Sequence, residues 1–210
     1  MAKRAKQKIR RMSEAIPTPA LPSGSIGVRA SGWWGMIFLI MSEASIFAYL
    51  FFAYFYYAVH FDYRPWPPYG PPSLVFPIPE TVLIFCGAAA MWWVNRRAAL
   101  DQHLPALLGL AITLTVGILF VLLGLWDWQD KPFTLSSDAY SSIYFILTGV
   151  HLTHAVIGVL MAAAVLTWSA AGYLGPVRHV LVTVTAIYWY FLAATWAALF
   201  FTLYITPYLG

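Results

Sequence analysis

Five long apolar runs, separated by shorter polar segments, dominate the pattern of the chain. They cover about residues 33–59, 74–94, 104–125, 140–168 and 180–204. A helix that crosses the hydrocarbon core of a membrane, which is roughly 30 Å thick, needs about 20 apolar residues, and each run reaches that length. The pattern predicts an all-α membrane protein whose membrane domain, residues 32–210, is a bundle of five transmembrane helices.

The composition excludes several classes of protein. Apolar and aromatic residues make up 61% of the 210 residues, and charged residues make up 10%, against about 25% in a soluble domain. We therefore exclude a soluble enzyme, a nucleic-acid-binding protein and a disordered chain. The single cysteine, Cys86, allows neither a disulfide within the chain nor a cysteine-based metal site.

The positions of the basic residues predict the orientation in the membrane. Residues 1–31 begin with six basic residues in eleven positions and continue with a stretch rich in Pro, Ser and Gly, which we predict to be a basic cytoplasmic tail and lead-in. If the N-terminus is inside, the other inside basic residues are Arg29, Arg96, Arg97 and Arg178, and the outside ones are Arg64 and Lys131. By the positive-inside rule, the N-terminus is cytoplasmic and the C-terminus is outside.

Three ionisable residues lie deep within the apolar runs. Glu43 is ten residues past Trp33, which places it about 15 Å into the membrane. A charged carboxylate at such a depth costs at least about 2.5 kcal/mol, so it is expected to be functional or paired. The alternative is a neutral carboxyl that serves only helix packing. His151 and His154 lie equally deep in the fourth run, and their spacing places both on one helix face.

Three interpretations of these histidines compete. As haem ligands they fail, because two neighbours on one helix cannot bind opposite faces of one iron. As metal ligands they lack a third partner unless Glu43 supplies it. A buried polar cluster of Glu43, His151 and His154 is the most economical interpretation, and we predict neither a metal site nor a catalytic residue in the chain.

The ends of the runs carry further polar residues. Glu80 follows Pro79 at the start of the second run, which is typical of an ordinary helix start. Asp138 precedes the fourth run and is a candidate N-cap. Small residues such as those at 87–90 and 162–164 permit close helix contact. Since no nucleophile–base pair, phosphate-binding loop or redox motif is present, the chain is expected to be one subunit of a complex.

Two motifs resemble a known family. Residues 133–145 (FTLSSDAYSSIYF), residues 148–154 (TGVHLTH) and Gly158 resemble subunit III of the haem–copper terminal oxidases, which has a pattern like FTxSDxxYxSxxFxxTGxHxxHxxxG. Residues 41–47 (MSEASIF) resemble the family's SExxxF segment, whose buried glutamate corresponds to Glu43. Residues 188–191 (YWYF) and 196–200 resemble its last helix. The resemblance covers about residues 33–205. With five spans, the chain is similar to the short bacterial form of the family.

The chain departs from the family pattern at several positions. The histidine and aspartate of the family's WHFVD segment are Tyr190 and Ala193, and a glutamate common early in that helix is Thr183. The family's QxxEY at the end of the third run corresponds to Gly124, Asp127 and Trp128, whereas His179 matches a family histidine.

The resemblance implies a subunit without redox centres. The haems and copper belong to the partner subunits I and II, which reduce oxygen and pump protons. Subunit III packs against subunit I, binds phospholipids in a cleft and supports proton uptake and sustained turnover in aerobic respiration, in the bacterial inner membrane. The cleft is expected to separate the first two spans from the last three. Residues expected to contact lipid or to lie near the proton-uptake side are Arg96, Arg97, Arg178 and His179.

Other functions remain open at this point. The chain could be a subunit-III-like protein of a nitric oxide reductase system. It could also be a stand-alone small transporter that uses Glu43 and the histidines as a proton relay, although no inverted repeat or pair of broken helices is apparent. A third class is an assembly or lipid-binding factor.

Overall fold

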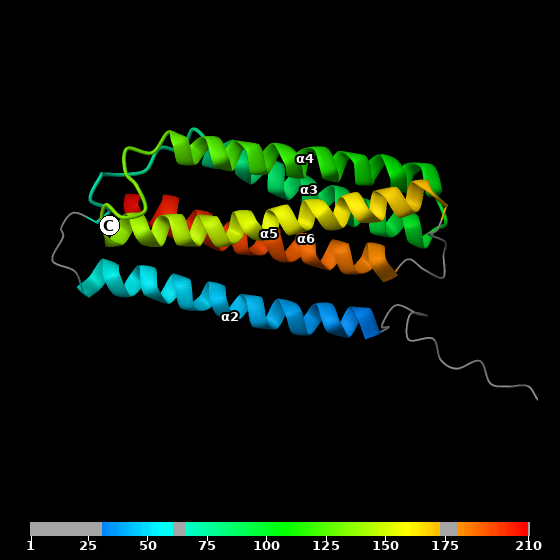
Figure 1. Cartoon of the computed structure of the whole chain (residues 1–210), viewed down its shortest axis with the longest axis horizontal. Coiled ribbons are helices and arrows are strands. Elements are labelled where there is room, and N and C mark those ends of the chain that lie inside the picture. Colours follow the sequence, from blue (N-terminus) through cyan, green and yellow to red (C-terminus); the bar gives the residue numbers. More distant parts are fainter. Residues whose placement is uncertain (1–30, 61–65, 173–179, 210) are drawn as a thin grey trace, which may run out of the picture.

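The computed structural model describes residues 31–60, 66–172 and 180–209. The five long helices that run side by side in Figure 1 are long and apolar enough to cross a membrane, which confirms the prediction of five candidate spans. The elements are α2 (Ser31–His60), α3 (Pro77–Ala99), α4 (His103–Gln129), α5 (Ala139–Ala170), α6 (Val180–Phe200), the π-helical turn η2 (Phe201–Ile205) and the 3-10 turn η3 (Thr206–Tyr208).

Some predictions fall outside the described residues. Apart from Ser31, the basic tail is not among them, and neither are Arg64, Arg178 and His179. The expected contacts of these residues are therefore not part of the structure.

The helices extend beyond most of the apolar runs that predicted them. α3 continues through Arg96 and Arg97, and α4 continues to Gln129. Backbone hydrogen bonds within a helix form as readily at polar residues as at apolar ones, so hydrophobicity marks the membrane crossing and not the helix end. α3 is an exception at its N-terminal end, because it begins at Pro77, inside the predicted run.

Local chemistry explains where the helices begin and end. Asp138 caps α5, because its carboxylate accepts a 2.8 Å hydrogen bond from the backbone N–H of Ser141, as predicted. The turn from α3 to α4 passes through Asp101, whose φ of 57° reverses the chain within a few residues. Beyond α5, Gly172 has a φ of 75°, a conformation that ends helices and that glycine adopts without steric cost.

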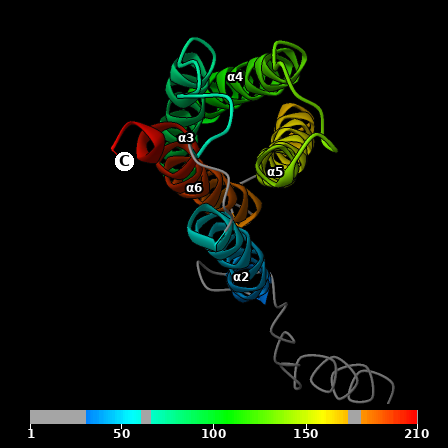
Figure 2. The same ribbon diagram turned by 90° about the vertical axis from the view of Figure 1, so that its left-hand side faces the viewer.

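Consecutive helices run in opposite directions, so the first helix begins and the last one ends at opposite ends of the bundle (Figure 1). Viewed from the end, α3, α4, α5 and α6 form a four-helix group, and α2 lies outside it against α6 and α5 (Figure 2). The expected division into spans one and two against spans three to five is wrong. α3 packs mainly on α4 and α6, and Gly87 of α3 allows close contact with Trp189 of α6.

One tryptophan fills the centre of the four-helix group. Trp189 of α6 is 1% exposed, and its ring lies over Gly87 of α3 and Gly117 of α4, where a β-carbon would collide with it. Its indole N–H donates to the carbonyl of Gly158 on α5 at 3.3 Å. Small residues thus allow four helices to surround one large ring, in the way that small residues generally allow close helix contact in membranes.

Candidate functional site

Glu43 and His154 meet across the contact between α2 and α5. The Glu43 carboxyl oxygen Oε2 lies 3.0 Å from His154 Nε2. On the other side of the ring, Nδ1 is 2.7 Å from the carbonyl oxygen of Val150. A carbonyl can only accept a hydrogen bond, so Nδ1 carries a hydrogen.

That tautomer determines what the pair can share. With Nδ1 protonated, two states are possible. Either a protonated Glu43 donates to Nε2 of a neutral ring, or Nε2–H of a cationic ring donates to an ionised Glu43. In both states the pair holds one proton between the two groups and has no net charge. This is the form in which two ionisable groups cost least inside a membrane.

The pair lies near the edge of the protein. The Glu43 side chain is 25% exposed and that of His154 is 11% exposed. The ring of Phe47, one turn along α2, lies 5.4 Å from the His154 ring, and the Tyr188 hydroxyl donates to the backbone carbonyl of His154 at 3.2 Å. The open side of the pair therefore faces whatever surrounds α2 and α5.

His151 is held separately, although the sequence placed it in the same cluster. It is 1% exposed, and its Nε2 lies 3.1 Å from the carbonyl of Leu192 on α6, to which it donates. Phe120 of α4 and Trp196 of α6 also contact its ring. The structure thus joins Glu43 to His154, and it joins His151 to the four-helix group.

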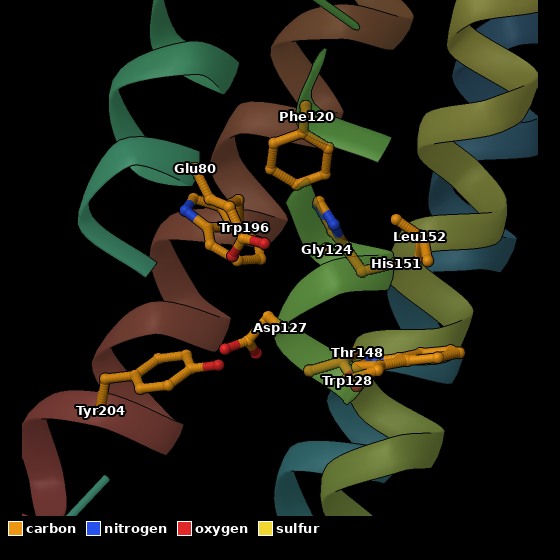
Figure 3. Close-up of a pocket in the computed structure, with 10 residues that line it drawn as sticks. All are labelled: Glu80, Phe120, Gly124, Asp127, Trp128, Thr148, His151, Leu152, Trp196 and Tyr204. Carbon is orange, nitrogen blue, oxygen red and sulfur yellow. Dashed lines mark hydrogen bonds between the residues drawn. The ribbon is translucent and has the colours of Figure 1, made fainter. Parts of the chain in front are cut away.

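A second polar cluster, which sequence reasoning missed, lies at the end of the bundle that carries the C-terminus. Glu80 of α3 and Asp127 of α4 are each 3% exposed. Asp127 accepts from Lys131 at 2.8 Å and from the hydroxyl of Tyr144 at 2.7 Å. The Tyr144 hydroxyl is 2.9 Å from that of Tyr204, which points toward Asp127 in Figure 3.

Sequence position alone could not reveal this cluster. Glu80 and Asp127 lie at helix ends, where acidic residues usually meet water. The available signal was the departure at Gly124, where the family has a glutamine. A β-carbon at Gly124 would lie 3.4 Å from Glu80 Oε1, so the Glu80 side chain occupies the space beside a residue that has no side chain.

The two described arginines that were predicted to contact lipid lie near the opposite end. The Arg97 guanidinium donates to Gln102 at 2.7 Å and lies 5.4 Å from the ring centre of Trp93. Arg96 lies over the ring of Trp92. Cations stacked on tryptophan are suited to a membrane interface, where the ring is partly in the apolar layer.

Metal binding has no support within the described residues, where no three His, Cys, Asp or Glu side chains are close enough together to hold an ion. Glu43 and His154 supply two ligands, and His151 is bonded elsewhere.

Comparison with known proteins identifies the family. The profile of the family described as "Cytochrome c oxidase subunit III" matches residues 23–208. Cytochrome c oxidase subunit 3 of Drosophila melanogaster is 28% identical over 190 residues, covering 86% of this chain and 70% of the relative. The same subunit of Myxine glutinosa is 29% identical and covers 84% and 70%, respectively, and that of Pisaster ochraceus is 29% identical and covers 81% and 68%.

The match includes all five apolar helices and both motifs that meet at Glu43 and His154. The chain is a multi-pass membrane protein and belongs to the cytochrome c oxidase subunit III family.

Proposed function

We propose that the chain is the non-redox subunit III of a haem–copper terminal oxidase. In this role it packs against subunits I and II, which carry the haems and copper, and it supports proton uptake and sustained oxygen reduction. The observation that carries the proposal is the hydrogen bond between Glu43 and His154. It brings the SExxxF and TGxHxxH motifs of the family together across two helices.

The geometry favours a supporting role over a catalytic one. Glu43 and His154 are bonded to each other across two helices, so that they share a single proton within a neutral pair. A paired carboxyl at the edge of α2 can fix that helix to the bundle and can buffer charge beside a neighbouring subunit. Either effect would act on turnover through the partner.

Orientation and location follow from the same proposal. With the N-terminus cytoplasmic, Arg96 and Arg97 lie on the cytoplasmic side and Lys131 on the outer side. The proposed location is the bacterial plasma membrane. The exposed apolar side chains along α2, among them Phe38, Tyr49 and Phe52, offer surface for phospholipid tails and for a partner subunit.

Isolation of the complex tests the proposal. We would tag the chain, extract it in mild detergent, and record the visible spectrum and the masses of the co-purifying subunits. Haem absorption together with two larger subunits supports an oxidase, and oxygen consumption distinguishes it from a nitric oxide reductase. A colourless single chain, in each of several detergents, would overturn the proposal in favour of a transporter or an assembly factor.

A further inference from the structure

A small cavity lies between the four packed helices beside the second polar cluster (Figure 3). Its volume is about 20 Å³, and a cavity needs roughly 10–15 Å³ to hold one water molecule. The lining residues are Glu80, Phe120, Gly124, Asp127, Trp128, Thr148, His151, Leu152, Trp196 and Tyr204. Several of these carry polar groups, and a buried water needs two to four polar partners. The cavity therefore has room and partners for one water.

Glu80 is the buried carboxyl on this cavity that lacks a protein hydrogen bond among the described residues. Its side chain is almost fully buried and lines the cavity, yet its carboxyl makes no hydrogen bond to any residue within the ranges that the structure describes. An ionised carboxylate without a partner is very costly in an apolar environment, so such a group holds a proton instead. A protonated carboxyl still needs a hydrogen-bond partner, and a water in the cavity supplies it.

The lysine beside Asp127 is not available to neutralise a negative charge on Glu80. The two oxygens of Asp127 are already used by the Lys131 ammonium and the Tyr144 hydroxyl, so the one cation of the cluster is committed to Asp127. A second carboxylate at the cavity would leave the cluster with a net negative charge inside the bundle. Repulsion by Asp127 therefore adds to burial in keeping Glu80 neutral.

A second, larger cavity approaches the same cluster from the end of the bundle. Its volume is about 210 Å³, and Lys131 and Tyr144 line it together with residues of the segments 69–73 and 130–133. Asp127 lines only the inner cavity. The hydrogen bonds of Lys131 and Tyr144 to Asp127 thus form a thin polar partition between the two cavities.

We propose that Glu80 and one water in the inner cavity form a buried proton-holding site, which exchanges its proton with the larger cavity across the partition of Asp127, Lys131 and Tyr144. On the outward path Glu80 gives its proton to the water, the water gives one to Asp127, and Asp127 gives one to Lys131 as Lys131 releases a proton to the larger cavity. A proton returns to Glu80 by the reverse steps, so Glu80 is protonated again and charge and atoms balance. The site is separate from the Glu43–His154 pair, and it does not depend on the proposed oxidase role.

Ionisable groups from several elements face the site. Asp127 and Lys131 come from α4 and its end, His151 and Tyr144 from α5, and Tyr204 from η2. His151 donates to the Leu192 carbonyl through Nε2. Its other ring nitrogen makes no hydrogen bond to a residue in the described ranges, so it is a further polar neighbour for the water.

Infrared spectroscopy tests whether Glu80 is protonated. We would use the tagged full-length chain, with any subunits that co-purify, and record difference spectra in H₂O and D₂O near neutral pH. We expect the carbonyl band of a protonated carboxylic acid, shifted in D₂O and lost in Glu80→Gln. The matched control Asp101→Asn, at an exposed carboxylate, should retain the band.

A second carboxyl variant keeps the test decisive if Glu80→Gln does not fold. Glu80→Asp keeps the acid but shortens it, and the band should move to a new frequency. A carboxylic acid band that is unchanged in both variants, or the absence of any such band in the wild type, would overturn the proposal.

The exchange route has its own readout. After transfer into D₂O, the shift of the Glu80 band should be at least severalfold slower in Asp127→Asn than in the wild type. Asp130→Asn changes an exposed residue that lines only the larger cavity and should leave the rate unchanged. Equal rates in all three proteins would exclude the partition as the route.

Discussion

The hydrogen bond between Glu43 and His154 shows how much one contact carries at the residue scale. It is a polar link between α2 and α5, and the Nδ1 bond to the Val150 carbonyl fixes the orientation of the His154 ring. The sequence predicted a cluster of Glu43 with both histidines. It could not predict that His151 would bond to α6 instead, because residues three apart on a helix lie on nearly the same face.

Substitutions at Glu43 separate hydrogen bonding from ionisation. Glu43→Gln keeps a donor for His154 Nε2, so we expect assembly and thermal stability close to wild type. Glu43→Leu removes the partner of His154 and should lower the free energy of unfolding by about 1–3 kcal/mol. Thermal unfolding of the purified complex measures both.

Ser42→Ala is the control for these variants, since the Ser42 hydroxyl bonds only to its own helix, at the Leu39 carbonyl. If Glu43→Gln assembles and starts at the normal rate but loses activity during turnover, ionisation of Glu43 matters. A Glu43→Leu complex as stable as the wild type would contradict the structural role of the pair.

Asp138 gives the fold a dependence on acid pH. Burial alone would raise the pKa of this carboxyl, but hydrogen bonds from the Tyr69 hydroxyl at 2.6 Å and from the Ser141 backbone N–H outweigh it, and the pKa lies below the ordinary 3.8. A lowered pKa stabilises the folded state above pH 3.8, and this contribution is lost as the pH falls through the folded pKa.

Tyr69→Phe tests this pH dependence. Loss of the hydroxyl removes one bond to the carboxylate, so the pKa of Asp138 should rise toward its ordinary value. The variant should be less stable than the wild type at neutral pH, and it should lose less of its stability on acidification. Melting temperatures between pH 3 and 7 are the measurement. Tyr208→Phe is the matched control, because its hydroxyl donates to the uncharged carbonyl of Pro72. An equal change in the pH dependence of both variants would disprove the role of Asp138.

Glu80 marks the limit of prediction from single residues. An acidic residue after Pro79 is an ordinary helix start, and the helix does begin there. Its burial arises from the packing of α4 and α6 over the first turn of α3, and from the room left by Gly124. These are tertiary facts, which no local pattern contains.

At the scale of helices, length and apolar composition were sufficient to predict five elements, and the Asp138 cap was predictable from its position. The ends were less accurate, as α4 shows, because a helix continues past the last apolar residue. The small residues at 87–90 predicted close contact but not its partner. The ring they accommodate belongs to Trp189, a residue about one hundred positions away in the chain.

Gly87→Ala should therefore destabilise the bundle. The added methyl group would collide with the ring of Trp189, which is buried and has no free space to turn. Overpacking of this kind costs about 1–3 kcal/mol. Thermal unfolding in detergent measures the loss, and Trp189→Phe in the same chain should recover part of it.

Gly35→Ala controls for the effect of replacing a helical glycine by alanine. No atom lies within 4 Å of its added β-carbon, and alanine favours the helix, so stability should stay equal or rise. Equal destabilisation at Gly35 and Gly87 would show that helix propensity, and not the contact with Trp189, determines the result.

At the scale of the whole molecule, the sequence predicted the number of spans but not their grouping. α2 is by far the least buried helix within the protein. In its most apolar stretch 11% of the residues are buried, against 61% in the last span. Hydropathy is nearly the same for a helix that faces lipid and for one that faces protein, so the pattern could not show that α2 packs on α5 and α6 while α3 packs on α4.

The proposed orientation can be tested by cysteine labelling, because the chain has a single cysteine. In a Cys86→Ser background, Ser136→Cys places an exposed thiol at the end of the bundle with the C-terminus, and His103→Cys places one at the opposite end. The excess of basic residues on the His103 side favours a cytoplasmic location, so a membrane-impermeant maleimide should label Ser136→Cys in spheroplasts. His103→Cys should react only after the membrane is opened, which also shows that its thiol is accessible. Labelling of His103→Cys in sealed spheroplasts, with Ser136→Cys protected, would reverse the orientation, and it would place the cavity beside Lys131 on the cytoplasmic side.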